Sequence, residues 1–437
     1  MIKFKNYSKK DNAYQIYVSS ILSLGLRLVG MLFVYLLTVI ITRNFGARTM
    51  GLYSLSLTVI SIAVLISCLG MDTAMLKMSS KYLAKKNGFM IKKVYKKCFF
   101  IVLSSSILIS TFIFIFSNLI ANSVFNDSSL SIYLKISSLA VIPFSLMFLS
   151  TESLRGLRKI KEYVFIRNVI PYFVALITLI LLIFVLGNYL SPIISIMVGI
   201  WTSFIFSFFY FRKHSAKLTK GHNDEINYRK ILSLSLPFLF ASSLFMIMEW
   251  TDKIMLGIFG SSTDVGIYAV SAKIASVTIL SLFAINSIVA PKFSEFYTKN
   301  KLDKLFETVK YANKLILLTS LPIAIIIFLF PEQILNIFGS EFASGKLALL
   351  ILTIGFLFNA LSGSVGYLLQ MTDNQKTYQT IILISALLNV ILNWFLIPRF
   401  GVNGAAFASM ISMIFWNLSS IIVVKRKFGF FTIRFFN

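Results

Sequence analysis

The stretch LFMIMEWTDKIMLG, residues 244–257, places three ionisable side chains inside an otherwise apolar segment. Glu249 and Lys253 are four residues apart and Asp252 lies between them, so a helix would carry all three on one face. Charged groups in a membrane-embedded helix are costly, and they usually face a cavity or one another. Two hypotheses stay open for these residues. They form a structural ion network with Lys273 of the following apolar segment, or they form a site that binds a coupling ion.

The composition indicates that lipid surrounds most of the chain. Of its 437 residues 57% are hydrophobic and only 13% are charged, and the mean hydropathy is +0.83. A soluble protein of this length needs more charged residues to cover its surface. Apolar runs recur with roughly the 20-residue length that a helix needs to cross a bilayer. Twelve membrane-spanning helices are predicted: 14–41, 51–71, 98–121, 132–150, 163–187, 190–211, 231–258, 266–290, 311–331, 346–370, 377–397 and 404–424.

The formal net charge of +26 could suggest a nucleic-acid partner, but the placement of the cations argues against it. With the first segment inside and the spans alternating, 34 of the 42 Lys and Arg residues fall on inward-facing segments. This asymmetry follows the positive-inside rule and predicts that both termini are cytoplasmic. The basic charge is therefore interpreted as a topology signal that also attracts anionic lipid head groups, and no nucleic-acid partner is expected.

The sequence contains an internal repeat, because NFGARTMGLYSLS resembles IFGSSTDVGIYAVS. Past one inserted residue a constant shift of 215 pairs Gly51 with Gly266, Tyr53 with Tyr268 and Lys77 with Lys292. Six spans in each half is an even number, so both halves insert with the same orientation, as in transporters built from parallel repeats. The predicted fold is an all-α membrane protein of twelve transmembrane helices in two parallel six-helix repeats. Its predicted parts are an N-terminal lobe, 1–211, a cytoplasmic linker, 212–230, and a C-terminal lobe, 231–437.

Two motifs resemble a known family. NVILNWFLIPRFGVNGAAFAS (389–409) resembles the carboxy-terminal signature of polysaccharide-export flippases of the O-antigen type. TDKIMLGIFGSSTDVGIYAVSAKI (251–274) resembles the opening of their second half. The likeness covers essentially the whole chain, and its superfamily also contains multidrug exporters and the lipid II flippase.

The resemblance implies a transporter and not an enzyme. The implied cargo is an undecaprenyl-pyrophosphate-linked oligosaccharide, an O-antigen or capsule repeat unit. The implied movement is from the inner to the outer leaflet of the bacterial cytoplasmic (inner) membrane. Expected partners are this lipid-linked oligosaccharide, membrane lipids, and a glycan polymerase with its chain-length machinery.

The resemblance also implies a site for a coupling ion. In the lipid II flippase branch a sodium site is formed by an acid in span 7, two polar residues four apart in span 11 and a hydroxyl in span 12. These positions fall on Asp252, Asn389, Asn393 and Ser409. Because the second span-11 residue is an acid in that branch, H+ coupling through Glu249 stays open beside Na+ coupling. Hydrogen bonding between helices is the alternative role for the asparagines, and no resident cofactor or metal is expected.

Cations in or near the spans are candidate ligands for the diphosphate of the substrate. Arg27 lies near the middle of the first span, where it needs an aqueous cavity or an anionic partner. A guanidinium binds phosphate oxygens in a bidentate manner and keeps its proton; a bond between helices is the alternative. The other candidates are Lys253, Lys273, Arg48, Lys77 and Lys292. For the last three, the alternative is a role in capping a loop or in setting the topology.

Two other functions compete with the flippase hypothesis. A cation-coupled multidrug exporter of the same fold calls for an acid-lined pocket, whereas the predicted spans hold three cations and two anions away from their ends, which favours an anionic substrate. A membrane-embedded glycan polymerase or glycosyltransferase needs a sizeable extracytoplasmic loop or an acid pair for a metal diphosphate, and the sequence shows neither. A flippase that works by alternating access between two lobes is therefore the preferred interpretation.

Overall fold

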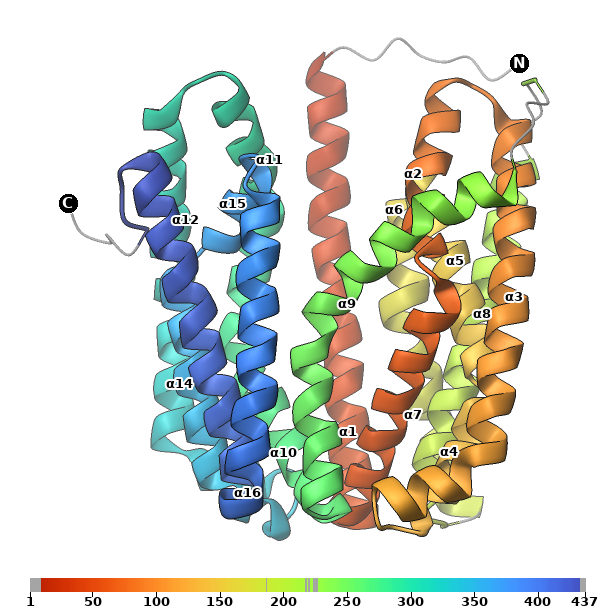
Figure 1. Cartoon of the computed structure of the whole chain (residues 1–437), viewed down its shortest axis with the longest axis vertical. Helices are drawn as coiled ribbons and strands as arrows, with labels where there is room; N and C mark the ends of the chain where they lie inside the picture. Colours follow the sequence, from red (N-terminus) through yellow and green to blue (C-terminus); the bar gives the residue numbers. More distant parts are fainter. Residues whose placement is uncertain (1–8, 186, 217, 219–220, 223–226, 433–437) are drawn as a thin grey trace. The chain divides into compact units, whose positions relative to one another are not determined.

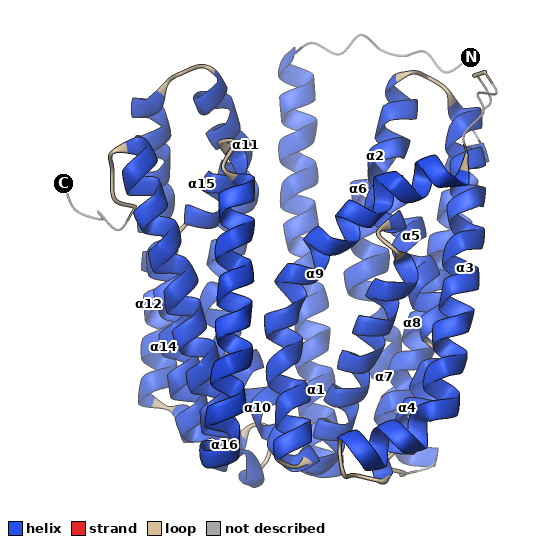
Figure 2. Ribbon diagram, viewed as in Figure 1, coloured by secondary structure: helices blue, strands red, loops and turns tan. Residues whose placement is uncertain are grey.

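The computed structural model describes residues 9–185, 187–216, 218, 221–222 and 227–432. Within these ranges it describes the side chains of all residues except 9–21, 230, 240–242, 244 and 245. Every regular element in this part of the chain is a helix (Figures 1 and 2). The longer helices are α1 (Lys9–Cys68), α2 (Met71–Ala84), α3 (Gly88–Leu119), α4 (Ser129–Ser138), α5 (Val141–Gly156), α7 (Ile170–Val185), α8 (Ser191–Ala216), α9 (Tyr228–Phe259), α10 (Ser262–Ala275), α11 (Leu280–Thr298), α12 (Leu302–Leu329), α14 (Lys346–Ser362) and α16 (Gln375–Phe428). Short helical turns are η1 (Ile120–Val124), α6 (Ile160–Val164), η2 (Phe165–Val169), η3 (Ser276–Ile279), α13 (Pro331–Asn336), η4 (Ser340–Gly345) and α15 (Val365–Met371).

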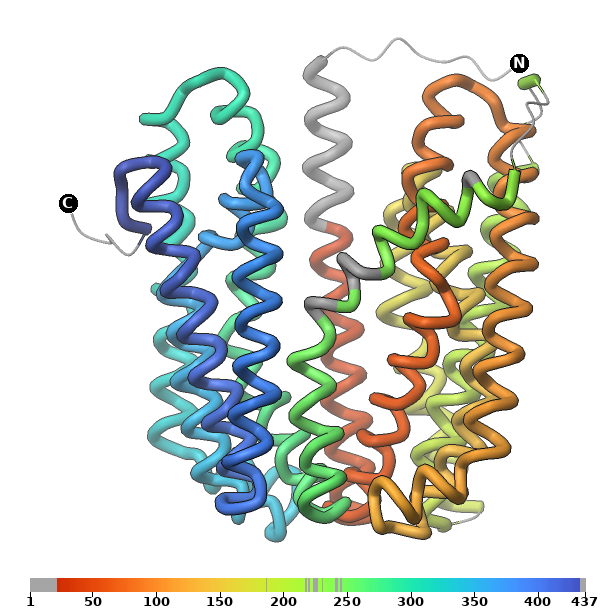
Figure 3. The backbone as a smooth tube through the Cα atoms, in the orientation of Figure 1, coloured from red at the N-terminus to blue at the C-terminus, as the bar shows by residue number. Residues whose placement is uncertain are grey.

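Each of the two longest helices turns back along its length (Figure 3), and each contains one glycine with non-helical backbone angles. Gly46 in α1 has φ 78° and ψ −178°, and Gly401 in α16 has φ 53° and ψ −128°. Residues with a side chain rarely adopt these conformations, so glycine allows the chain to change direction there. The breaks separate pairs of predicted spans, 14–41 from 51–71 in α1 and 377–397 from 404–424 in α16.

The described residues contain eight helical segments that are long and apolar enough to cross a membrane. The pair α4 and α5, bent by 44° at a short break, is a ninth candidate. Two of the eight, Leu22–Cys68 and Gln375–Phe428, contain a glycine break between two predicted spans. The chain is therefore an all-helical, multi-pass membrane protein, whereas the number of twelve crossings and the cytoplasmic position of both termini stay predictions.

The first of two compact units comprises residues 1–37, 60–115 and 135–239. In it, α2 packs on α5, and α8 packs on both α5 and α7. Its apolar core includes Met75 and Met90, which are fully buried. Long apolar side chains from several helices thus hold this unit together.

The second compact unit comprises residues 38–59, 116–134 and 240–437. In it, α14 packs on α10, α12 and α16, and α11 packs on α12. Phe293 and Leu305 are fully buried in one of its apolar clusters. This unit therefore combines the second half of the sequence with two segments of the first half. The division into lobes 1–211 and 231–437 stays a prediction.

Candidate functional site

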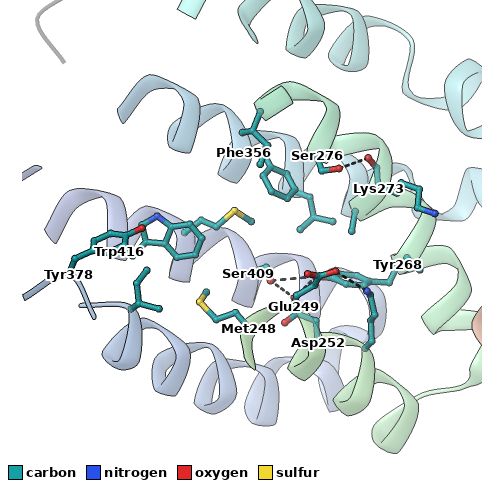
Figure 4. A pocket seen from close by; sticks show the side chains of 17 residues that line it. Met248, Glu249, Asp252, Tyr268, Lys273, Ser276, Phe356, Tyr378, Ser409 and Trp416 are labelled. Carbon is teal, nitrogen blue, oxygen red and sulfur yellow. Dashed lines mark hydrogen bonds and ion pairs between the residues drawn. The ribbon is translucent and has the colours of Figure 1, made fainter. Parts of the chain in front are cut away.

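A cavity of about 480 Å³ lies within the second unit, among α9, α10, α14 and α16 (Figure 4). Its size falls in the range of roughly 300–1,000 Å³ that is usual for small-molecule sites. Asp252, Tyr268 and Ser409 gather in one part of it, and Tyr378 and Trp416 lie in another (Figure 4). The cavity thus has a polar region and an aromatic region.

Asp252 is the centre of the polar region, where its side chain is 4% exposed. Its Oδ1 atom accepts hydrogen bonds from Asn389 Nδ2 at 3.1 Å and Asn393 Nδ2 at 2.7 Å. Its Oδ2 atom accepts hydrogen bonds from the Tyr268 hydroxyl at 2.5 Å and from the Ser409 hydroxyl. All four donors are neutral, and Asp252 forms no ion pair with the described residues.

The shape of α16 explains why three of these donors meet. Asn389 and Asn393 are one helical turn apart, so they share a face. Ser409 follows the break at Gly401, and the chain turns back there, which brings Ser409 Oγ within 3.5 Å of Asn389 Nδ2. The four residues that the family resemblance assigns to an ion site, Asp252 among them, therefore lie in direct contact. Their role in ion binding stays a prediction.

The polar region has the chemistry of a site for a small cation. Asn393 Oδ1 is buried and has no hydrogen-bond partner among the described residues, which is costly for a buried acceptor. A carboxylate, amide oxygens and a hydroxyl are hard ligands of the kind that alkali and alkaline-earth cations prefer. Rotation of an asparagine amide exchanges Nδ2 for Oδ1, and so turns a donor to Asp252 into a cation ligand. The residues present therefore fit Na+ and, through the Asp252 carboxyl, H+.

The other predicted charges of this region also line the cavity, but they have different partners. Lys253 Nζ lies 3.5 Å from Glu249 Oε1. Lys273 Nζ donates a hydrogen bond to Thr38 Oγ1 at 2.6 Å. The two acids and two bases therefore do not form a single ion network, because the partners of Asp252 are all neutral groups.

The remaining candidate cations are not among the residues that line this cavity. Arg27 is exposed on α1 of the first unit, and its side chain makes no hydrogen bond or ion pair with described residues. Lys77 belongs to the same unit and lies 5.7 Å from the ring centroid of Phe238. Arg48 Nη2 is 3.2 Å from Asp127 Oδ1, and Lys292 is exposed on α11. The structure thus places two of the six candidate cations, Lys253 and Lys273, at the cavity.

The first unit contains a buried ion cluster to which the sequence interpretation assigns no role. Glu152 has 8% of its side chain exposed, and it pairs with Arg167 at 2.6 Å and with Arg155 at 3.3 Å. The Arg167 guanidinium also lies 4.1 Å from the ring centroid of Phe148. These residues fall in a segment predicted to face the cytoplasm. From the sequence alone, their charges are therefore interpreted as determinants of membrane topology. The only local signal is the i, i+3 spacing of Glu152 and Arg155.

A comparison with protein families identifies the chain. The sequence profile described as "Polysaccharide biosynthesis protein" matches residues 18–297, which is more than half of the chain. The chain belongs to the polysaccharide biosynthesis protein family. The MatE profile matches residues 237–395, so it covers the helices that line the cavity only in part.

Curated relatives of this polysaccharide biosynthesis protein match over part of their length. The "Probable low-salt glycan biosynthesis flippase Agl15" of Haloferax volcanii is 30% identical over 165 residues, which are 38% of this chain and 35% of the relative. The "Putative O-antigen transporter" of Salmonella typhimurium is 24% identical over 225 residues, which are 50% of this chain and 51% of the relative. The matched region thus spans between a third and a half of these relatives.

Solved structures of transport proteins share the fold of this family member. The lipid II flippase MurJ, in an inward closed conformation, matches with a TM-score of 0.73 and 16% identity over 94% of this chain and 87% of the other. The MATE multidrug transporter DinF-BH matches with a TM-score of 0.67 and 18% identity over 97% of both chains. These similarities show that the chain shares the fold of MurJ and DinF-BH.

Tyr268 is a site residue of this polysaccharide biosynthesis protein that the sequence interpretation leaves without a role. It is 3% exposed, and its hydroxyl contacts both Asp252 and, at 3.4 Å, Ser409. The available signal is its pairing with Tyr53 in the internal repeat, because Tyr53 is also buried. The repeat marks the position as structurally equivalent in both halves, but it does not show that one hydroxyl reaches a carboxylate.

Proposed function

We propose that the chain is a flippase that moves a lipid-linked oligosaccharide from the inner to the outer leaflet of a bacterial cytoplasmic membrane, with undecaprenyl pyrophosphate as the lipid carrier. The observation that carries this proposal is the cavity in which Lys253 and Lys273 lie together with Asp252. Ammonium groups bind diphosphate oxygens. Relatives named as glycan flippases and O-antigen transporters support the choice of a glycan lipid as cargo.

The charge of the cavity links the coupling ion to the substrate. Glu249, Asp252, Lys253 and Lys273 sum to a formal charge of zero when Asp252 is ionised. A proton or Na+ at Asp252 leaves the cavity with a charge of +1, which favours a diphosphate. Linkage then requires that the cation and the anionic substrate raise each other's affinity by the same factor.

The aromatic region of the cavity suits the sugar part of the cargo. Trp416, Tyr378 and Phe356 line it, and they present flat apolar faces beside polar Nε1 and hydroxyl groups. We expect Trp416→Ala to lower transport about 2- to 10-fold, since a stacked ring contributes about 0.5–1.5 kcal/mol. Trp416→Phe should retain most of the activity. Export is measured as surface glycan per unit of membrane-inserted protein.

Trp394 provides a matched control for that experiment. It is 58% exposed, packs edge-on against Phe259, and does not line the cavity. Trp394→Ala should leave export unchanged. Equal losses for Trp416→Ala and Trp394→Ala would show that removing any tryptophan harms the protein, and would contradict a stacking role.

A second prediction concerns Arg27, the exposed cation of the first unit. As a ligand of the substrate diphosphate, it should be essential: Arg27→Ala is expected to abolish surface-glycan assembly while the protein still reaches the membrane. Arg27→Lys distinguishes a need for charge, which it keeps, from a need for the bidentate guanidinium, which it loses. Glycan assembly by Arg27→Ala at a normal protein level would reject this assignment.

Deletion of the gene tests the proposed function as a whole. The expected result is a lipid-linked oligosaccharide that accumulates on the inner leaflet, detected by mass spectrometry of extracted lipids and by its protection from glycosidases added to intact cells. A plasmid copy should return the glycan to the surface. Unchanged lipid-linked pools and unchanged surface glycan in the deletion strain would refute the proposal.

A multidrug exporter is the second candidate, and one observation favours it. The MatE profile matches residues 237–395, and DinF-BH has the same fold. Under this alternative, the deletion strain would accumulate a cationic dye such as ethidium, and its surface glycan would be normal. The two functions therefore give opposite results in the same strain.

A further inference from the structure

Equivalent parts of the internal repeat meet within the second unit. Residues 38–59 and 116–134 come from the first half of the sequence, yet they belong to the same compact unit as residues 240–437. There, the helical part of α1 that follows Gly46 contacts the start of α10. The predicted topology places these helix ends on the outer side of the membrane.

Two glycines allow the close approach of these helices. A Cβ atom on Gly51 would overlap the carbonyl of Ser262, and one on Gly266 would overlap the carbonyl of Ala47. The glycine of each helix therefore rests on the first turn of the other. The shift of 215 pairs Gly51 with Gly266, so the contact joins equivalent glycines of the repeat.

The contact brings two helix N-termini together. Each N-terminus has unpaired backbone N–H groups and a partial positive charge of roughly half a unit. Two such ends repel each other unless acceptors or anions lie between them. The α10 end is capped from within the helix by Ser261 and Asp264, whose side chains bond to each other's backbone N–H groups. In addition, an acid from the opposite half of the sequence lies at each of the two ends.

Asp127 lies at the start of α10. Its Oδ2 atom accepts a hydrogen bond at 2.7 Å from the hydroxyl of Ser262, the first residue of that helix. Its Oδ1 atom accepts from the Ser129 N–H at 3.0 Å and from Arg48 Nη2 at 3.2 Å. An acid from the first half of the sequence thus holds the beginning of a helix from the second half.

Glu341 lies at the corresponding end in α1. Its Oε1 atom accepts a hydrogen bond at 2.9 Å from the Ala47 N–H, directly after the break at Gly46. Here an acid from the second half caps a helix from the first half. The shift of 215 places Asp127 opposite Phe342, one residue from Glu341, so the two acids occupy nearly equivalent positions in the repeat.

An arginine reinforces each contact. Arg48 bonds to Asp127, as described above. Arg43, also in α1, donates from Nε to the Ile337 carbonyl at 2.8 Å and from Nη2 to the Asn336 carbonyl at 2.6 Å. Hydrogen bonds from a charged donor are stronger than neutral ones, so both sides of the contact are held by charge-assisted bonds.

We infer that Asp127 and Glu341 form a reciprocal latch, in which an acid from each half of the sequence bonds to the first turn of a helix of the other half and both bonds must break before the outer face opens during transport. The hydrogen bonds described above are the evidence for the latch. Its role in opening rests on the proposed transport function. It explains why the two helix ends can stay in contact despite their like charge. It also makes opening a concerted event, because two equivalent contacts share one interface.

The Asp127 contact is not a pH switch near neutrality. Burial acts to raise the pKa of Asp127, but hydrogen bonds from Ser262 and the Ser129 N–H, together with Arg48, outweigh burial and hold this pKa below its usual value. Because this pKa is lowered in the closed contact, ionised Asp127 stabilises the contact at every pH above the usual carboxyl pKa. The stabilisation is lost only as the pH falls through the lowered pKa.

Thiol labelling measures the opening directly. Ala272→Cys places a thiol in the cavity, and a membrane-impermeant maleimide is added to intact cells. The parent protein reports the background from Cys68 and Cys98, which are both buried. We expect Asp127→Asn and Glu341→Gln each to raise the labelling rate from outside about 10-fold, and the double variant about 100-fold, because each removes one charge-assisted contact. Labelling from inside, in inverted vesicles, should not rise.

Glu332→Gln is the matched control. Glu332 pairs with Lys346 at 2.8 Å, so this variant removes an acid within the second half without touching a helix of the first half. If Asp127→Asn and Glu341→Gln are labelled no faster than Glu332→Gln, the latch proposal is wrong. Equal rises from both sides would also overturn it, because they indicate local unfolding. The labelling needs no glycan, so failure of the latch and failure of the flippase assignment are read separately.

Discussion

Asp252→Asn is expected to abolish the dependence of transport on the coupling ion. Asp252 is the only acid in direct contact with Asn389, Asn393, Tyr268 and Ser409 among the described residues. The substitution keeps the size of the side chain but removes the charge that attracts H+ or Na+. Coupling free energies of about 1–3 kcal/mol correspond to a roughly 5- to 150-fold change in affinity, and this factor should fall to one.

The measurement is export of glycan, or of a fluorescent lipid-linked analogue in proteoliposomes, with an imposed Na+ or H+ gradient. The parent protein should respond to one of the two gradients and Asp252→Asn to neither. Asp303→Asn is the control, because Asp303 is exposed at the start of α12 and should leave coupling intact. If Asp252→Asn still responds to the gradient at a normal protein level, the polar cluster is a structural network only.

Removal of both cavity lysines is expected to have the second large effect. Each hydrogen bond to a charged group contributes about 1.5–3 kcal/mol, so Lys253→Gln and Lys273→Gln should each weaken diphosphate binding roughly 10- to 100-fold. Both side chains line the cavity, and the amide retains a donor without the charge. The measurement is calorimetric binding of farnesyl pyrophosphate, a short prenyl diphosphate, to the purified protein.

The effect of the coupling ion on farnesyl pyrophosphate affinity distinguishes a loss of binding from a loss of folding. If the anion and the cation are linked at Asp252 as proposed, farnesyl pyrophosphate should bind the parent protein more tightly when the coupling ion is present, and the double variant should lose this difference. Lys346→Gln is the control, since Lys346 is half exposed and pairs with Glu332 away from the cavity. Equal affinities for the double variant and the parent would exclude both lysines as ligands of the diphosphate and leave Arg27 as its proposed ligand.

The sequence by itself determines the class of protein and much of the ion-site candidate. A composition with few charges and long apolar runs requires a helical membrane protein, and the structure confirms this. The spacing of Asn389 and Asn393 predicts that they share a helix face, since helical periodicity is a local property. The resemblance adds Asp252 and Ser409, and all four side chains do meet. Their role in ion binding stays a prediction.

Only the tertiary structure decided which faces of different helices meet. It turned the Tyr268 hydroxyl toward Asp252, gave Lys273 a partner in Thr38, and left Arg48 bound to Asp127 rather than at the cavity. These partners are between 16 and 235 residues apart, and no local pattern encodes such contacts. Their choice depends on how whole helices rotate and pack, because in a membrane the apolar faces look alike to lipid and to protein.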